Sequence, residues 1–185
     1  MPKILGSWGG MRRYLEQEML APRLRGRVRY GCTTYVGMDG CRIFTLALDG
    51  KVVRRFSWET VNSWLLAAGK KKPSATQAGI AGYWEGFWQA LEAVPPAKRP
   101  VHTDREYCEA LARYRSQPIA ASLASSDPLV VMFALFDRRC GRRTLLRLSA
   151  EAAGWPGWLR ELFGFRLAAE GLPACTTDEK GASRL

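Results

Sequence analysis

The side chains of this sequence that could do chemistry are mainly arginines. The chain of 185 residues carries 28 Lys and Arg against 17 Asp and Glu, a net charge of +11. Most of the arginines lie within segments whose pattern predicts folded structure, where a rigid guanidinium can hold a phosphate through two hydrogen bonds. The charge therefore indicates a polyanionic partner, and nucleic acid is the most abundant one in a cell. The alternative is a solvated basic surface that attracts RNA only non-specifically.

One group of arginines lies on a predicted three-stranded antiparallel meander. Residues 27–36 alternate in polarity, residues 41–48 and 51–57 read as two further strands, and Asp49-Gly50 is a strong hairpin signal. If the first hairpin has a four-residue loop at 37–40 and the second a two-residue loop, one sheet face carries Val28, Tyr30, Cys32, Val36, Ile43, Ala47, Val52 and Phe56. The other face then carries five cations together with aromatic and aliphatic residues, in the order Arg27, Arg29, Tyr35, Arg42, Phe44, Leu46, Leu48, Lys51, Val53 and Arg55.

This second face mixes cations with aromatic side chains, a combination that lets a sheet stack bases and neutralise phosphates. Two other outcomes stay open. Because Leu46, Leu48 and Val53 favour burial, a helix could cover the centre and leave the arginines as a solvated rim. A register shift of one residue would exchange the two faces entirely.

A second basic cluster surrounds Gly141 at the junction of two predicted helices. Its members are Arg138, Arg139, Arg142, Arg143 and Arg147. If the helix continues, Arg139, Arg143 and Arg147 share one side, where they could hold backbone phosphates or an acidic protein surface. Alternatively, the cluster caps helix carbonyls and pairs with Asp137 and Glu151. A helix-turn-helix is disfavoured because residues 129–133 are uniformly apolar and residues 142–153 show no polar recognition face.

Catalytic chemistry has little support in the sequence. His102 is the only histidine, and no Gly-rich nucleotide loop is present. The residues Asp39 and Asp49-Gly50-Lys51 resemble a metal-dependent nuclease signature, but a hairpin turn explains the second acid better. Cys32 and Cys41 across the first hairpin read as core thiols. We therefore expect a binding protein without metal or cofactor, with an unrecognised enzyme as the less favoured interpretation.

The fold class that the sequence predicts is α+β, with the three-stranded meander packed against a largely helical remainder. We expect a single domain over residues 1–171 and a disordered tail over residues 172–185. The predicted helices cover residues 8–21, 58–68, 80–93, 104–115, 118–124, 128–140, 142–153 and 156–170. Ser57 and Asp127 are predicted helix caps, and Gly141 is a predicted helix end.

Composition also bears on the compartment. The longest apolar stretch, residues 129–136, is shorter than the roughly 20 residues that span a bilayer, and the first residues lack the apolar core of a signal peptide. The five cysteines, an odd number without CxxC spacing, are typical of reduced thiols. We therefore expect a cytoplasmic protein that does not bind membranes.

Two stretches of the chain together carry a family resemblance. The first runs from MRRYLEQEMLAP at residue 11 through YVGMDGCRIF to FSWETVN at residue 56, and the second from SDPLV at residue 126 through LFDRRCGRRTL. On these stretches the chain resembles an uncharacterised family of short Firmicute proteins, often encoded on mobile elements. The resemblance implies a small cytoplasmic bacterial protein. It assigns no functional residue.

Together these observations predict a non-enzymatic basic protein that engages nucleic acid or a nucleoprotein complex. The predicted contact residues are Arg27, Arg29, Arg42, Arg55, Arg138, Arg139, Arg142, Arg143 and Arg147. The alternative is a protein-interaction module, for example an inhibitor or accessory factor of a mobile element, that docks on an acidic protein partner.

Overall fold

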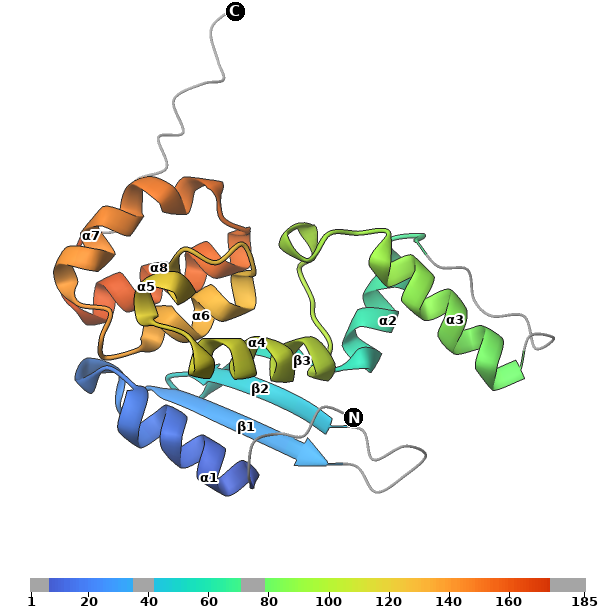
Figure 1. The fold of residues 1–185 in the computed structure, drawn as a ribbon, viewed down its shortest axis with the longest axis horizontal. Coiled ribbons are helices and arrows are strands. Elements are labelled where there is room, and N and C mark those ends of the chain that lie inside the picture. Colours follow the sequence, from blue (N-terminus) through green and yellow to red (C-terminus); the bar gives the residue numbers. More distant parts are fainter. Residues whose placement is uncertain (1–6, 35–41, 71–78, 174–185) are drawn as a thin grey trace, which may run out of the picture.

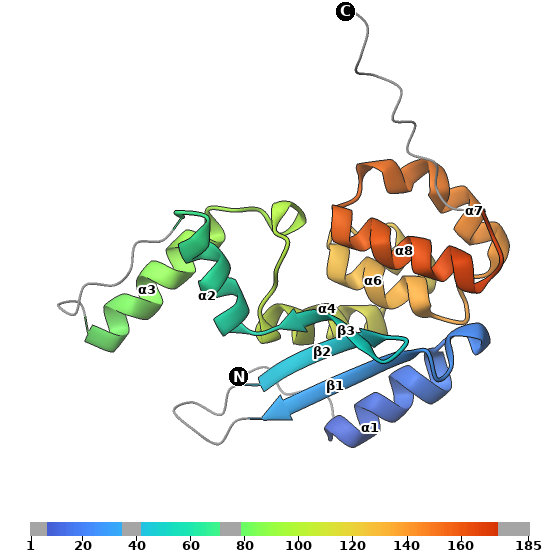
Figure 2. The same cartoon turned by 180° about the vertical axis from the view of Figure 1, so that it is seen from behind.

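The computed structural model describes residues 7–34, 42–70 and 79–173 of the chain. Three strands, β1 (Val28–Thr34), β2 (Arg42–Leu48) and β3 (Lys51–Phe56), form an antiparallel sheet in the order β1-β2-β3. Helices lie on one face of this sheet, and a smaller pair of helices extends to one side (Figures 1 and 2). The predicted α+β class is confirmed. No helix within the described ranges is long and apolar enough to span a membrane.

The second hairpin forms where the sequence predicts it. Asp49 and Gly50 both have positive φ, 47° and 81°, the left-handed conformation that a tight two-residue hairpin requires and that Asp-Gly favours. The Asp49 N–H donates to the Arg27 carbonyl at 2.7 Å and so extends the pairing of β1 with β2 to the first residue of the turn. Local backbone preference therefore determines this part of the fold.

The first hairpin differs from the prediction by one residue of register. Thr34 pairs with Arg42, Cys32 with Phe44 and Tyr30 with Leu46, so the chain between the paired residues is seven residues long, 35–41, instead of four. The predicted turn itself, at 37–40, lies outside the described residues. This shift moves Phe44 and Leu46 to the face of Val28 and Tyr30, where both are buried. The predicted grouping of Phe44 with the arginines is wrong, because these large apolar side chains gain more from the core than from a solvent-facing position.

The main core lies between the sheet and a layer of helices. Helix α4 (Asp104–Ser116) packs on the inner face of the sheet, where the Tyr107 ring stacks on Phe44 with centroids 4.5 Å apart and contacts Phe56 at 4.8 Å. Helix α6 (Pro128–Phe136) is buried along its whole length between α4 and α8 (Gly157–Ala169). An apolar helix of this kind needs neighbours on every side, as its sequence predicts.

The remaining elements surround this core. Helix α1 (Trp8–Arg13) continues as a π-helical segment, Tyr14–Met19, beside β1, so the predicted helix over 8–21 forms in a less regular way. Short helices connect the longer ones: η2 (Pro22–Leu24), α5 (Ile119–Leu123) and η4 (Ala152–Gly154).

Helices α2 (Trp58–Ala67) and α3 (Gly79–Glu92) form a lobe beside the main body (Figure 1). The lobe has a small core of its own, made of Val61, Leu65, Phe87 and Leu91 and bordered by half-buried tryptophans. The chain returns from it through η3 (Pro96–Lys98) to α4. The single-domain boundary at residue 171 stays a prediction, and residues 174–185 of the expected tail lie outside the described residues.

The predicted helix caps are confirmed, but one predicted helix end is not. Ser57 Oγ accepts from the Thr60 N–H at 3.2 Å, and the Asp127 carboxylate accepts from the Leu129 N–H at 2.8 Å. Helix α6, however, ends at Phe136 and not at residue 140, and Gly141 is the N-cap of α7 (Arg142–Glu151). The condition under which Arg139 would share one side with Arg143 and Arg147, a continuous helix, is therefore not met.

The helix ends early because Asp137 turns the chain. Its carboxylate is fully buried, accepts from the Tyr114 hydroxyl at 2.5 Å, and also accepts from the Arg139 N–H at 2.7 Å. A buried carboxylate requires several donors, and this turn supplies them where a continued helix would not.

Candidate nucleic-acid interface

The turn between α6 and α7 lies against the segment that follows the π-helix. Arg138 donates its N–H to the Met19 carbonyl at 2.7 Å, and the Ala21 N–H donates to the Phe136 carbonyl at 2.9 Å. These backbone hydrogen bonds place the chain that leads into η2 beside the start of α7. Two segments that are more than a hundred residues apart in the sequence therefore present their arginines at the same end of the molecule.

The end of α8 joins this arrangement through Glu170. Its carboxylate pairs with Arg166 at 2.6 Å and with Arg23 at 3.4 Å, and its carbonyl accepts from the Arg142 guanidinium. Arg166 is 2% exposed and also donates to the Cys140 carbonyl at 3.0 Å, so it is a structural link between α8 and the turn. Arg23 and Arg142, in contrast, are exposed.

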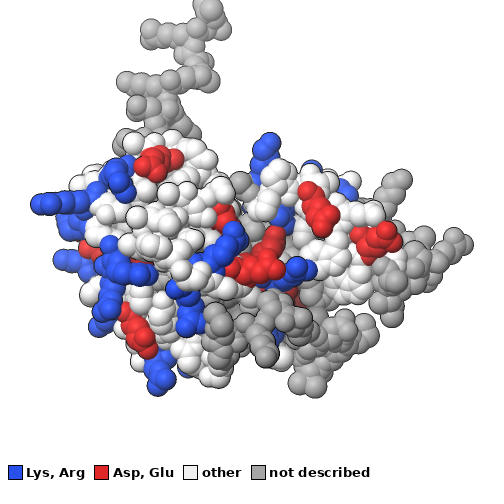
Figure 3. All heavy atoms as spheres, viewed as in Figure 1, with Lys and Arg blue, Asp and Glu red and all other residues white. Residues whose placement is uncertain are grey.

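We call this group of exposed cations the arginine corner, and it consists of Arg23, Arg138, Arg139, Arg142, Arg143 and Arg147. The carboxylates that pair with its members are those of Asp137 and Glu170. Within the described part of the chain, Arg138, Arg143 and Arg147 have no carboxylate partner. Figure 3 shows Lys and Arg side chains crowded over the end of the molecule that carries α1 and α7.

Arg139 differs from the other members because it is anchored. Its guanidinium donates to both oxygens of Asp137, with Nη2 at 2.6 Å and Nε at 3.0 Å from Oδ2. This hydrogen bonding raises the pKa of Arg139, and the side chain keeps 41% of its surface exposed. The alternative that part of the cluster pairs with Asp137 is therefore correct for Arg139.

Arg143 and Arg147 lie one turn apart on α7 and share a face of that helix. Both are exposed, and Leu146 between them is 50% exposed. Residues 142–151 include no aromatic residue and no Asn or Gln. This face can thus contact phosphates, but it lacks the side chains that stack on bases or read their edges.

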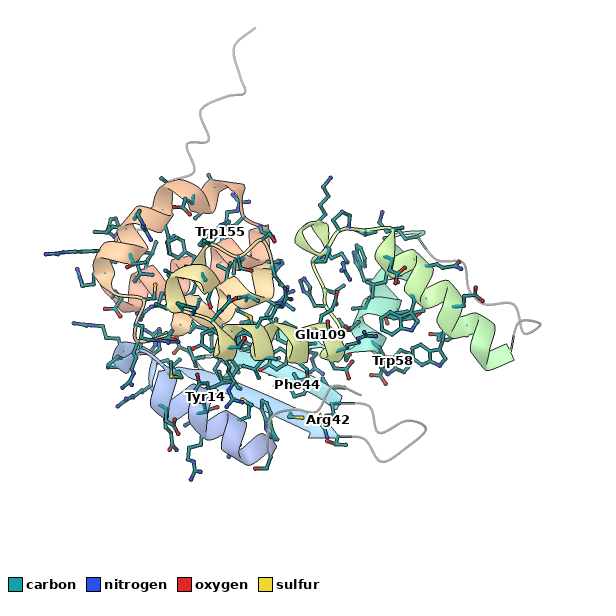
Figure 4. The ribbon with its side chains drawn as sticks, viewed as in Figure 1. Tyr14, Arg42, Phe44, Trp58, Glu109 and Trp155 are labelled. Carbon is teal, nitrogen blue, oxygen red and sulfur yellow. The ribbon has the colours of Figure 1, made fainter. Side chains whose placement is uncertain are left out.

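The structure does not bring the four predicted sheet arginines together. Arg27 pairs with Asp49 at 2.7 Å and lies over the Phe165 ring at 4.7 Å, and Arg29 pairs with Glu16 at 3.2 Å. Arg42, the first residue of β2, lies at the opposite end of the sheet from α7 (Figure 4). Arg55 projects from the outer face of β3 and has no ion pair with a described residue.

Candidate catalytic groups are buried or engaged. His102 is 1% exposed, and burial, followed by the charges of Arg54 and Arg99, lowers its pKa to about 3. Burial raises the pKa of Cys32, and Cys41 lies outside the described residues. Asp49, the acid of the nuclease-like signature, is held by Arg27. Over the described ranges, no group of His, Cys, Asp and Glu could hold a metal ion.

Sequence reasoning did not include Arg23 in the interface. The local signal was present, because residues 23–26 form a basic connector, but nothing in the sequence places this connector beside residue 138. That placement depends on the backbone contact of Leu20 with Asp137 and on the ion pair of Arg23 with Glu170.

Comparison with known protein families matches residues 7–167 to the SF0329 protein family. This match covers most of the chain and agrees with the expected membership of an uncharacterised family. No curated protein and no solved structure matches the chain. The Firmicute origin and the link to mobile elements that the resemblance implied stay predictions.

Proposed function

The chain belongs to the SF0329 protein family, and we propose that it binds the phosphate backbone of nucleic acid through the arginine corner, without catalysing a reaction. One observation carries the proposal. Two segments that are distant in sequence, η2 and residues 138–147, gather six exposed guanidinium groups around the carboxylates of Asp137 and Glu170. Of these six, Arg138, Arg143 and Arg147 have no carboxylate partner among the described residues.

Such an excess of fixed positive charge is unfavourable in isolation, because like charges repel. A chain of phosphates relieves the repulsion, gains charge-assisted hydrogen bonds to each guanidinium and releases condensed counterions. The side chains of α7 fit contacts to the backbone alone, so the binding we propose tolerates many sequences. It also favours a duplex, whose phosphates are regularly spaced, over a single strand held by stacking.

A binding role, and not an enzymatic one, is supported by the state of the reactive side chains. His102 is buried, and burial together with the charges of Arg54 and Arg99 lowers its pKa to about 3, so its imidazole is uncharged at neutral pH. The carboxylate of Asp137 is committed to Tyr114 and Arg139. These groups are used to hold the fold.

The test is fluorescence anisotropy of a labelled duplex of about 30 base pairs, as DNA and as RNA, at several salt concentrations. In the triple variant Arg138→Gln, Arg143→Gln, Arg147→Gln, we expect the Kd to rise at least tenfold. The slope of log K against log salt should fall by about 2 to 3, since each phosphate contact contributes about 0.9. The melting temperature should not change, because none of the three pairs with a described carboxylate.

The matched control is the triple variant Lys70→Gln, Lys98→Gln, Arg105→Gln, which removes the same charge from exposed positions of the lobe, its return segment and α4. It should change the Kd by less than threefold. If both triple variants weaken binding equally, the attraction is general and the arginine corner is not a site. If the wild-type protein does not bind either duplex near physiological salt, the proposed function is wrong.

A further inference from the structure

The outer face of the sheet is not covered by any described helix. Figure 2 shows β1, β2 and β3 in front, with α4 behind them. We call this surface the open sheet face. Its residues alternate along the strands with the residues that face the core, or lie at the bulge of β3. They are Arg29, Gly31, Thr33, Ile43, Thr45, Ala47, Val52, Val53 and Arg55. All nine are half-buried or exposed.

The composition of the open sheet face is not that of a solvated surface. Antiparallel sheets with one face in water usually carry polar and charged residues there. Here the centre is glycine, threonine and small aliphatic side chains, and Val52 and Val53 are 45% and 39% exposed. A register irregularity in β3 places both valines at the surface, since Ala47 pairs with Val52 and Leu46 with Arg54. These adjacent aliphatic side chains on an uncovered sheet face offer an apolar surface to a partner.

The register also limits the nature of the ligand. Phe44, one of the two aromatic residues predicted beside the arginines, faces the core, as Tyr30 does. The other, Tyr35, lies outside the described residues, and the nine residues of the open sheet face include no aromatic one. Sheets that bind single-stranded nucleic acid rely on such rings. Branched aliphatic side chains instead pack against the apolar side chains of another protein.

Charge selects among protein partners. The open sheet face has two cations, Arg29 and Arg55, and no acidic residue. Arg29 pairs with Glu16 from outside the face, whereas Arg55 is exposed without an ion pair to any described residue. A symmetric dimer through this face would place arginine near arginine, because such an interface pairs a surface with itself. A partner that brings carboxylates beside apolar side chains is complementary.

We propose that the open sheet face is a docking surface for a partner protein segment in which acidic side chains flank aliphatic ones. The aliphatic side chains would cover Val52, Val53 and Ala47, and the carboxylates would pair with Arg55 and the exposed side of Arg29. This surface is separate from the arginine corner, so the inference does not depend on the proposed nucleic-acid binding.

The experiment uses amide chemical-shift mapping of the full chain with defined probes. These are a nine-residue peptide of alternating Glu and Val, matched Lys-Val and Ser-Val peptides, and a single-stranded and a duplex oligonucleotide. We expect the Glu-Val peptide to give saturable shifts at residues 29–33, 43–47 and 52–55, with an affinity at least tenfold above the other two peptides. The arginine-corner triple variant should bind this peptide as the wild type does.

Two variants define the surface. Arg55→Glu should lower affinity for the Glu-Val peptide at least tenfold and raise affinity for the Lys-Val peptide, and Val53→Ser should lower both without reversing the preference. Arg160→Glu, at an exposed position of α8, is the control and should change neither. The proposal is overturned if all three peptides bind equally or none binds. It is also overturned if an oligonucleotide shifts these amides, or if they broaden with protein concentration through self-association.

Discussion

Arginine side chains are mostly exposed at the arginine corner, but they are largely buried at the junction between the lobe and the main body. We call this second region the buried junction, and it consists of Arg54, Arg99, His102 and Trp158. At the corner most guanidinium groups face solvent and outnumber their carboxylates. At the junction Arg99 is 4% exposed and pairs with Glu106 at 2.8 Å, and the Arg54 guanidinium lies over the Trp158 ring at 4.4 Å.

Burial determines what each arginine does. Arg54 donates to the Pro100 carbonyl, and burial, partly offset by the charge of Glu161, lowers its pKa to about 10. A buried guanidinium has exchanged water for fixed partners and is not available to a ligand. An exposed one without a carboxylate keeps its hydration and its charge for an incoming anion. A count of basic residues combines both kinds, and only their positions separate them.

The largest effect should follow from removing Arg99. Arg99→Ala leaves Glu106 without its cation at the start of α4, although the Thr103 N–H still donates to that carboxylate at 2.8 Å. We expect the free energy of unfolding to fall by about 3–4 kcal/mol, because losing one member of a buried ion pair leaves the other uncompensated. Urea unfolding followed by circular dichroism measures it.

Arg105→Ala is the matched control, because Arg105, like Arg99, pairs with a glutamate of α4. Arg105 pairs with Glu109 at 2.9 Å, but its side chain is 61% exposed, and a surface pair of this kind contributes well under about 1 kcal/mol. Equal losses for the two variants would mean that burial does not distinguish the roles of these arginines.

Where local chemistry decides, the sequence predicted the structure well. Asp49-Gly50 adopts the two positive φ angles of its hairpin, and Ser57 and Asp127 cap their helices. Each feature depends on a few adjacent residues whose backbone preferences agree with the fold.

The sheet register could not be predicted in the same way. It depends on how many residues connect β1 and β2, and on the stacking of Phe44 with Tyr107, which is 63 residues away in the chain. Alternation alone shows that a strand has two faces but not which residue of the partner strand lies opposite.

The arginine corner was predicted only in part, because some of its members are brought together by contacts between segments that are distant in the sequence. The residues around Gly141 form a cluster in the sequence, and four of the five belong to it by adjacency alone, 138–139 and 142–143. Arg23 joins them only because Leu20 pairs with Asp137 before the start of α7 and because Arg23 itself pairs with Glu170 at the end of α8. Asp137 ends α6 because Tyr114, on another helix, donates to it.

The buried junction should also make stability depend on pH. The pKa of His102 is about 3 in the folded protein, because of burial and then of Arg54 and Arg99, and about 6.5 in the unfolded chain. Between about pH 6.5 and pH 3, His102 therefore binds a proton in the unfolded state but not in the folded state. His102 costs no stability above about pH 6.5, and its cost grows as the pH falls toward 3.

Unfolding of the wild type and of His102→Leu at pH 7.5 and pH 4.5 tests this expectation. Carboxylates contribute to the pH dependence of both proteins, so the difference reports on residue 102. We expect the wild type to lose about 2–3 kcal/mol more than the variant between these two pH values, at about 1.4 kcal/mol per pH unit below 6.5. Parallel pH profiles would show that His102 is protonated in the folded protein.

The smallest expected change in stability distinguishes Arg139, which is bound to the buried Asp137, from the cations of the arginine corner that have no described carboxylate partner. Arg139→Gln removes charge-assisted hydrogen bonds from the buried Asp137, which keeps those from the Tyr114 hydroxyl and from the N–H of residue 139. Because the Arg139 side chain is 41% exposed, we expect a loss of only about 1–2 kcal/mol in the free energy of unfolding. Arg143→Gln has no described carboxylate to leave unpaired, so its melting temperature should equal that of the wild type. If instead Arg143→Gln is the less stable of the two, the exposed cations of the corner are held by the fold as Arg99 is, and their availability to phosphate would no longer follow from their position.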